Sequence, residues 1–259
     1  MSWWKTVLGG TLGYMIGGPL GAMLGVAFAG NISRRSSSFG GSSGNYGPGN
    51  QQRVQAAFFS SVFSVMRYIA KVDGKVSKSE IIMAQQVMEQ MQLSEEMQKV
   101  AKELFNQGKD NSFNLDEVLD QFRAESHRRT HLIRMFLEIQ IQASYADGVF
   151  DNKEHEALKY IAQKLRFPIH ELENLIQQFS AARGGANKLN IDDAYGILGI
   201  DKDLTDKELK RAYRRLLAQH HPDKLVAKGL PEEMIKVANE KTQEIISAYE
   251  LIKKHRGMR

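Results

Sequence analysis

The most distinctive chemistry in this chain lies in the run HPDK at residues 221–224, where an imidazole, a proline ring, a carboxylate and an ammonium group follow one another. The run separates two stretches with helical periodicity, 207–220 and 231–254. Proline has a fixed φ and no N–H, and it disfavours the α conformation for the residue before it. The first helix must therefore end near His220 or His221. The sequence predicts a helical hairpin whose stiff, exposed turn presents an imidazole and a carboxylate.

The first of these helices has two chemically different faces. At 100° per residue its basic side chains gather on one face and its apolar side chains on the other. An apolar stripe along the second helix matches it, so we expect an antiparallel pair with the basic face in water. Such a face is usually only solvated, but beside a rigid turn it becomes a candidate docking surface. The basic face comprises Lys207, Lys210, Arg211, Arg214 and Arg215, and the apolar stripes comprise Leu209, Tyr213, Leu216 and Leu217, then Met234, Ala238, Ile245, Ala248, Tyr249 and Ile252.

Four blocks of this region resemble the J-domain of DnaJ-type co-chaperones: DDAYGILGI (192–200), TDKELKRAYRRL (205–216), HPDK (221–224) and KTQEIISAYELI (241–252). A histidine near the dipole of a helix end, or an aspartate in a turn, is ordinary by itself. Neither explains all four blocks in this order and spacing. The resemblance implies that the basic helix and the turn bind a DnaK-type chaperone and stimulate its ATP hydrolysis. The residues it assigns to DnaK binding are His221, Pro222, Asp223, Lys210, Arg211, Arg214 and Arg215.

Composition limits the other function classes. With 259 residues and 42% apolar content, the chain can bury a core and is predicted to form two folded units. It has no cysteine, which excludes disulfides, thiol catalysis and cysteine-ligated zinc. The net charge of +5 comes without the interleaved basic and aromatic pattern of a nucleic-acid surface. Because no catalytic constellation appears and prolines are few, we expect an all-α protein that is not an enzyme, needs no cofactor and binds no nucleic acid.

Residues 7–30 contain no charged side chain over 24 positions. A helix of that length spans roughly 36 Å, enough to cross a hydrocarbon core of about 30 Å. The pattern predicts a transmembrane anchor within residues 1–32; a cleavable signal peptide and a glycine-rich amphipathic or disordered tail are the alternatives. Five glycines at four-residue spacing form a face that lets such helices pack closely. This predicts a homodimer in the lipid bilayer through Gly9, Gly13, Gly17, Gly21 and Gly25.

The charges that flank this stretch predict its orientation. Only Lys5 and the α-amine precede it, whereas Arg34, Arg35 and Arg53 follow it. The positive-inside rule then places the N-terminus outside and the rest of the chain in the cytoplasm.

The rest of the chain divides by composition and repetition. Residues 33–52 are rich in Ser, Gly and Asn and predict a flexible linker. Residues 53–182 form a helical domain with an internal duplication, and residues 183–190 link it to the J-like domain at 191–259. A single shift aligns VDGKVSKSE (72–80) with ADGVFDNKE (146–154), and it also superposes Val87 on Ile161, Met91 on Leu165 and Phe105 on Phe179.

Each copy of the duplication contains an acidic loop, Asp73-Gly74 in the first and Asp147-Gly148 in the second. The loops match only the second half of a calcium-binding helix-loop-helix, because the earlier ligand positions lack carboxylates, so an EF-hand is excluded. The duplicated unit resembles the tellurite-resistance TerB-like fold, for which metal binding by such loops is one interpretation. We predict helix capping instead of a metal site. The capping pairs are Ser77 with Glu80, Asp151 with Glu154, Thr205 with Glu208 and Asn114 with Glu117.

Taken together, the order of these parts resembles the DjlA-like family of bacterial membrane-anchored co-chaperones, with further support from RMFLEIQIQA (134–143), YADG (145–148) and HHPDKLVAKGLP (220–231). The resemblance implies a dimeric, single-pass regulator of DnaK in the inner membrane, with a periplasmic N-terminus. It also implies a link to envelope-stress and capsule-inducing signalling. The alternative functions are a metal- or tellurite-responsive sensor acting through the TerB-like domain, and a structural membrane protein with a degenerate J-domain.

Overall fold

The computed structural model describes residues 18–24, 50–72, 78–127, 129–145, 150–183, 190–227, 230–231 and 234–258. Within these ranges the regular structure is helical and no strand occurs, which confirms the predicted all-α fold class. A short helix covers residues 18–24. The longer elements are α4 (Asn50–Lys71), α5 (Lys78–Gln90), α6 (Glu95–Gln107), α7 (Leu115–Glu125), α8 (Thr130–Ser144), α9 (Asn152–Lys164), α10 (Ile169–Arg183), α11 (Ile191–Leu198), α12 (Asp206–His220), α13 (Pro222–Ala227) and α14 (Ile235–His255).

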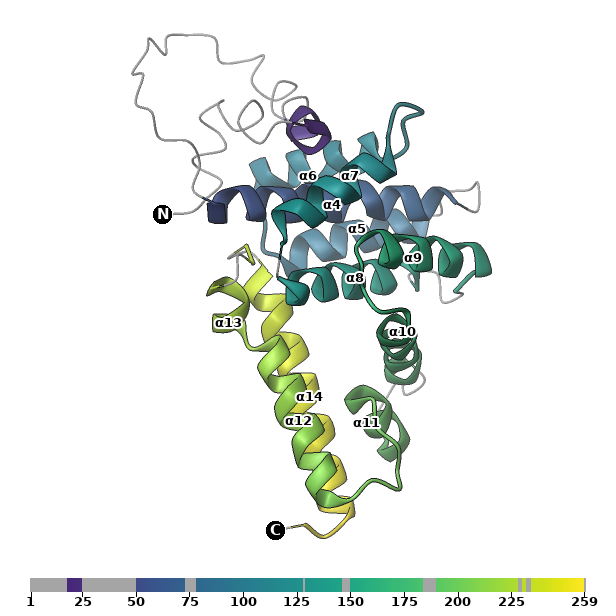
Figure 1. Ribbon diagram of the computed structural model, residues 1–259, viewed down its shortest axis with the longest axis vertical. Coiled ribbons are helices and arrows are strands. Elements are labelled where there is room, and N and C mark those ends of the chain that lie inside the picture. The colour runs from purple at the N-terminus through teal and green to yellow at the C-terminus, as the bar shows by residue number, and fades with distance from the viewer. Residues whose placement is uncertain are drawn as a thin grey trace.

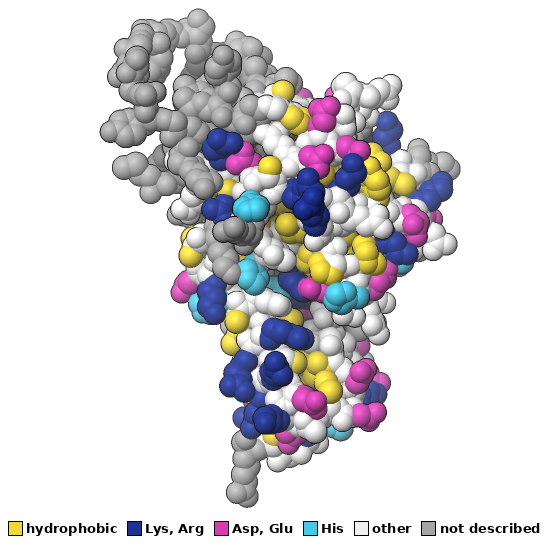
Figure 2. Space-filling model, in the orientation of Figure 1, with side chains coloured by type: hydrophobic (Ala, Val, Ile, Leu, Met, Phe, Trp, Pro, Cys, Tyr) yellow, Lys and Arg dark blue, Asp and Glu magenta, His cyan; other side chains and the backbone are white. Residues whose placement is uncertain are grey.

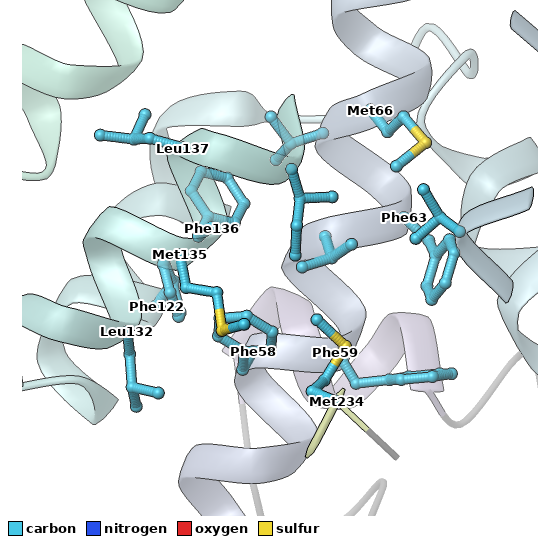
Figure 3. Packing of buried hydrophobic residues seen from close by; sticks show 14 of the residues in the cluster. Phe58, Phe59, Phe63, Met66, Phe122, Leu132, Met135, Phe136, Leu137 and Met234 are labelled. Carbon is cyan, nitrogen blue, oxygen red and sulfur yellow. The ribbon is translucent and has the colours of Figure 1, made fainter. Parts of the chain in front are cut away.

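Helix α4 lies at the centre of a bundle formed by α4 to α10 and packs against α6, α7 and α8 (Figure 1). Its residues 54–66 are buried on every side, as expected for a helix that runs through a core. Phe58 lies 6.0 Å from Phe122 of α7, which lies 5.0 Å from Phe136 of α8, measured between ring centroids. Two buried serines of α4, Ser60 and Ser64, are satisfied because they donate hydrogen bonds to carbonyls one turn earlier. Figure 3 shows these aromatic rings interleaved with the methionines of the same core.

The internal duplication is visible helix by helix. The shift that aligns the two copies carries α5 onto α9, both thirteen residues long, and carries the start of α6 onto the start of α10. The turns after α5 and α9 are also equivalent, since Gln92 and Arg166 both have positive φ, 49° and 55°. In each turn an amide N–H bonds a carbonyl five residues earlier, Leu93 to Met88 and Phe167 to Ala162.

The second unit consists of α11 to α14. Helices α12 and α14 form the predicted antiparallel pair, and α11 packs across α14 (Figure 1). Tyr213 and Tyr249 stack with their ring centroids 4.0 Å apart. Arg256 closes the end of the hairpin that is lowest in Figure 1, here called the lower end. Its side chain donates to the Tyr195 hydroxyl at 2.7 Å and to two carbonyls of the loop between α11 and α12. The buried residues of this small core are Ala194, Tyr195, Ile197, Leu198, Leu209, Leu216, Ile245, Ala248, Tyr249 and Ile252.

The upper end of this hairpin is part of the bundle core. Leu225 and Leu230, together with Met234 and Ala238 of the predicted stripe, are buried in the same hydrophobic cluster as α4. Gln55 of α4 donates a hydrogen bond to the Leu230 carbonyl at 3.4 Å. Met234 and Ala238 therefore differ from the sequence prediction, which paired them with the first helix of the hairpin. The two units share one continuous core at this end.

The N-terminal part is described only over residues 18–24. Leu20 and Leu24 are buried in the bundle core, and the Leu20 N–H donates to the Gln121 side chain at 2.9 Å. No helix in the described ranges is both long and apolar enough to cross a membrane. The remainder of the predicted span at 7–30 lies outside the described residues. Helix α4 begins at Asn50, within the segment predicted as a linker.

Candidate functional site

Helix α12 carries the predicted docking surface. It begins with a capping box in which the Thr205 hydroxyl accepts from the Glu208 N–H while the Glu208 carboxylate accepts from the Thr205 N–H. These hydrogen bonds from Thr205 lower the pKa of Glu208. The four residues assigned to DnaK docking on this helix are exposed, and Figure 2 shows Lys and Arg side chains gathered over the part of the molecule where Figure 1 places α12. They are Lys210, Arg211, Arg214 and Arg215.

The turn after α12 leads directly into a short helix, α13, that the sequence did not predict. His221 is extended, with φ −61° and ψ 122°, and Pro222 is the first residue of α13. The His221 carbonyl accepts hydrogen bonds from the N–H groups of Lys224 and Leu225, both at 3.1 Å. Proline suits the first position of a helix because it needs no donor there. The turn is thus held between the end of one helix and the start of the next.

The two polar side chains of the turn point away from the protein interior. His221 and Asp223 are exposed and Pro222 is partly buried. On the opposite side of α13, Leu225 is buried in the bundle core. A six-residue helix would be marginal alone, so its order depends on this packing. The bundle therefore fixes the direction in which the imidazole and the carboxylate are presented.

A second histidine stands directly before the turn. His220 is 3% exposed, and its Nε2 lies 3.5 Å from Oε1 of Glu138, a residue of α8 that is 6% exposed. Burial lowers the pKa of His220, an effect that the Glu138 charge opposes. The Thr242 hydroxyl donates to the His220 carbonyl at 3.1 Å, which ties α14 to the end of α12. The end of α12 is thus in contact with both α8 and α14.

The structure brings the seven predicted DnaK-binding residues together on α12 and the turn. For the predicted dimer face, it describes only Gly21, which is buried, whereas Gly9, Gly13, Gly17 and Gly25 lie outside the described residues. The two Asp-Gly loops also lie outside them. Among the described residues no group of three acidic or histidine side chains is arranged to hold a metal ion.

The burial of His220 has a signal in the sequence. His220 follows Leu209 and Leu216 at the spacing of one helix face, so its burial could be expected from periodicity. Its partner Glu138 carries no comparable signal, because it belongs to a distant helix. The hydrophobic pattern of the sequence also does not show that Leu225 and Leu230 are buried in the same core as α4.

Comparison with protein families identifies three parts of the chain. Residues 1–32 match the family described as co-chaperone DjlA transmembrane domain. Residues 60–177 match tellurite resistance protein TerB, and residues 193–257 match the DnaJ domain. The three matches follow the predicted order of anchor, TerB-like bundle and J-domain.

Individual proteins are similar over most of their length. The co-chaperone protein DjlA of Shewanella oneidensis is 43% identical over 225 residues, covering 85% of this chain and 86% of the relative. That of Coxiella burnetii is 39% identical over 270 residues, covering 100% of both. That of Photobacterium profundum is 38% identical over 278 residues, covering 99% of this chain and 100% of the relative. No solved structure gives a significant match.

Proposed function

Because this chain belongs to the DjlA family of membrane-anchored co-chaperones, we propose that it binds a DnaK-type chaperone through its J-domain and stimulates ATP hydrolysis by that chaperone. One observation carries the proposal. The His-Pro-Asp turn is exposed and fixed at the end of an exposed basic helix.

The basic helix supplies the docking surface. Lys210, Arg211, Arg214 and Arg215 extend over about one and a half turns and face solvent, so they form a compact positive patch. A patch of this kind attracts an acidic surface, speeds the encounter and sets the orientation of the partner. Its contribution is screened by salt because the charges are exposed.

The turn supplies the switch. The Asp223 carboxylate is exposed, so it is available to a basic group of the chaperone. A hydrogen bond between charged groups contributes about 1.5–3 kcal/mol, more than a neutral one. Pro222 restricts the backbone between His221 and Asp223, because the proline ring fixes φ.

Anchoring completes the proposal. The glycine-rich N-terminal segment would cross the inner membrane once, with its N-terminus in the periplasm and the TerB-like domain and J-domain in the cytoplasm, where DnaK and ATP are found. Its five glycines would pair two copies. The domain limits that we propose are 1–32 for the anchor, 33–52 for the first linker, 53–182 for the TerB-like domain, 183–190 for the second linker and 191–259 for the J-domain. Such a protein would recruit DnaK to the membrane surface and could feed envelope-stress or capsule-inducing signalling.

The test is single-turnover ATP hydrolysis by DnaK in the presence of the full-length protein and its Asp223→Asn variant. The substitution keeps the shape of the side chain and removes its charge. Loss of one charge-assisted hydrogen bond in the activated complex lowers stimulation by roughly ten- to a hundredfold.

Asp203→Asn is the matched control, because Asp203 is an equally exposed aspartate in the loop between α11 and α12. It removes the same charge from the same unit and is expected to leave stimulation unchanged. Full stimulation by Asp223→Asn would refute the role of the turn.

A further inference from the structure

A cavity of about 280 Å³ lies where the bundle meets the hairpin. Helices α5, α8 and α10 form its walls on the bundle side, and α14 forms the wall on the hairpin side. Most of the lining is apolar, from Met83, Met135, Ile139, Phe179 and Val237. The volume is near the lower end of the range for small-molecule pockets, and it leaves room for on the order of ten non-hydrogen atoms.

One polar group in this lining is both buried and unsatisfied. Glu138 is 6% exposed, and its Oε1 has no hydrogen-bond partner among the described residues. Its nearest basic neighbour is His220, at 3.5 Å. Burial lowers the pKa of that imidazole, so at neutral pH the ring is uncharged and does not balance the carboxylate. A buried carboxylate oxygen without a hydrogen-bond partner is costly, and a cation that enters the cavity would remove this cost.

The rim of the cavity also carries negative charge, like Glu138. Glu240 and Glu244 of α14 line the cavity, and Lys241 is the only basic lining residue that the structure describes. Lys241 is already paired with Glu244 at 2.8 Å, and its ammonium lies 4.9 Å from the centroid of the Phe179 ring. Three carboxylates and one ammonium belong to the lining, and outside the lining the Lys236 ammonium lies 4.0 Å from Glu240, so the charges that face the cavity still sum to a negative value. The position of Lys241 also shows that the Phe179 face accepts a cation at this wall.

We propose that this cavity is a binding site for a small organic cation, with an apolar body and one protonated amine. The amine pairs with the Glu138 carboxylate, and the apolar body packs against Met83, Met135 and Ile139. Because the two units each supply part of the wall, only their docked arrangement contains the complete site. A bound cation therefore stabilises the contact between the TerB-like bundle and the J-domain.

The proposal is independent of chaperone binding, so it can be tested without DnaK. The probes are 2-phenylethylammonium, 2-phenylethanol and 3-phenylpropanoate, which share an aromatic body of matching size and differ in charge. Titration into the full-length protein with ¹³C-labelled methionine methyl groups reports on the site directly, because Met83 and Met135 line the cavity. Met97, which is buried in the bundle core but does not line the cavity, serves as an internal reference.

We expect saturable shifts of the Met83 and Met135 methyl signals with 2-phenylethylammonium. The alcohol should bind at least about tenfold more weakly, because it lacks the charge-assisted contact, and the carboxylate should not bind. Glu138→Gln keeps the side-chain shape and should abolish the preference for the amine over the alcohol. Glu89→Gln, at an exposed position of α5, should preserve it.

Two results would overturn the proposal: equal binding of all three probes, and an unchanged preference for the amine in Glu138→Gln. Val237→Phe gives a second test that leaves Glu138 in place. It fills the cavity from α14 and should prevent the amine from binding, whereas undiminished binding in that variant would place the amine elsewhere.

Discussion

The two ends of the α12–α14 hairpin are stabilised in different ways. The lower end has its own core around Ile245 and Ile252 and is closed by the Arg256 side chain. The upper end has no separate core, since Leu230 and Met234 are buried with the phenylalanines of α4. The upper end carries the His-Pro-Asp turn to which we assign chaperone binding. The difference shows that the J-domain folds around its own lower half but depends on the TerB-like bundle for the placement of its site.

This arrangement gives α13 two opposite sides with separate roles. One side buries Leu225 in the bundle, and the other exposes Asp223 to solvent. A chaperone that binds the turn must therefore approach from the side away from α4. Because Leu225 is buried in the bundle core, the turn is attached to the bundle as well as to the hairpin.

The largest expected effect comes from a cavity at the upper end. Met234→Ala removes a side chain that is 0% exposed, and substitutions of this kind cost about 2–5 kcal/mol. We expect faster amide hydrogen exchange in both α4 and the start of α14, because the two share this core. Hydrogen exchange of the full-length protein, read by mass spectrometry, measures both segments at once.

Ile245→Ala is the matched variant at the lower end, where Ile245 is 1% exposed. The substitution should lower the stability by a similar amount. Amide hydrogen exchange should become faster in α11, α12 and the later part of α14, while the amides of α4 stay protected. If both variants opened the same segments, the two ends would not be independent and the comparison would fail.

The sequence predicted the local features of this structure better than the contacts between its parts. The Thr205–Glu208 and Asp151–Glu154 capping boxes are confirmed, because each depends on residues three apart. Burial of Met234 was also predicted from periodicity, but the predicted partner, the first helix of the hairpin, was wrong, because Met234 packs in the bundle core. A helical stripe says which face is buried and carries no information about which of two neighbours covers it. The contact between His220 and Glu138 was missed for the same reason.

An intermediate effect is expected from pH. Burial lowers the pKa of His220, and the nearby charges of Lys241 and Arg134 act in the same direction, whereas those of Glu138 and Glu244 oppose it. An undocked His220 takes up a proton as the pH falls through about 6.5, while the docked one resists protonation. The His220 contribution to docking is therefore complete above that pH and decreases as the solution becomes more acidic.

The measurement is the distance between two spin labels, one on each unit. The chain has no cysteine, so cysteines can be introduced for labelling at Lys99 of α6 and Ser247 of α14, both exposed. We expect the distance distribution to broaden between pH 7.5 and pH 5.5. His220→Gln should remove much of this dependence, and His221→Gln, at the exposed neighbouring histidine, should retain it. A wild-type distribution that does not change with pH would show that His220 does not control docking.

The smallest expected effect concerns a single hydrogen bond at the upper end. Gln55 of α4 donates to the Leu230 carbonyl at 3.4 Å, and both residues are buried. Gln55→Ala leaves that carbonyl without this donor and costs about 1 kcal/mol, since a typical intramolecular hydrogen bond contributes about 0.5–1.5 kcal/mol net. The loss should appear as roughly fivefold faster exchange of the amides of α13 and the start of α14, with the lower end unchanged. Gln51→Ala, at an exposed position one turn earlier in α4, should leave exchange as it is. Faster exchange around Ile245 in Gln55→Ala would instead mean that the bundle stabilises the whole hairpin, and the two ends would then differ only in degree.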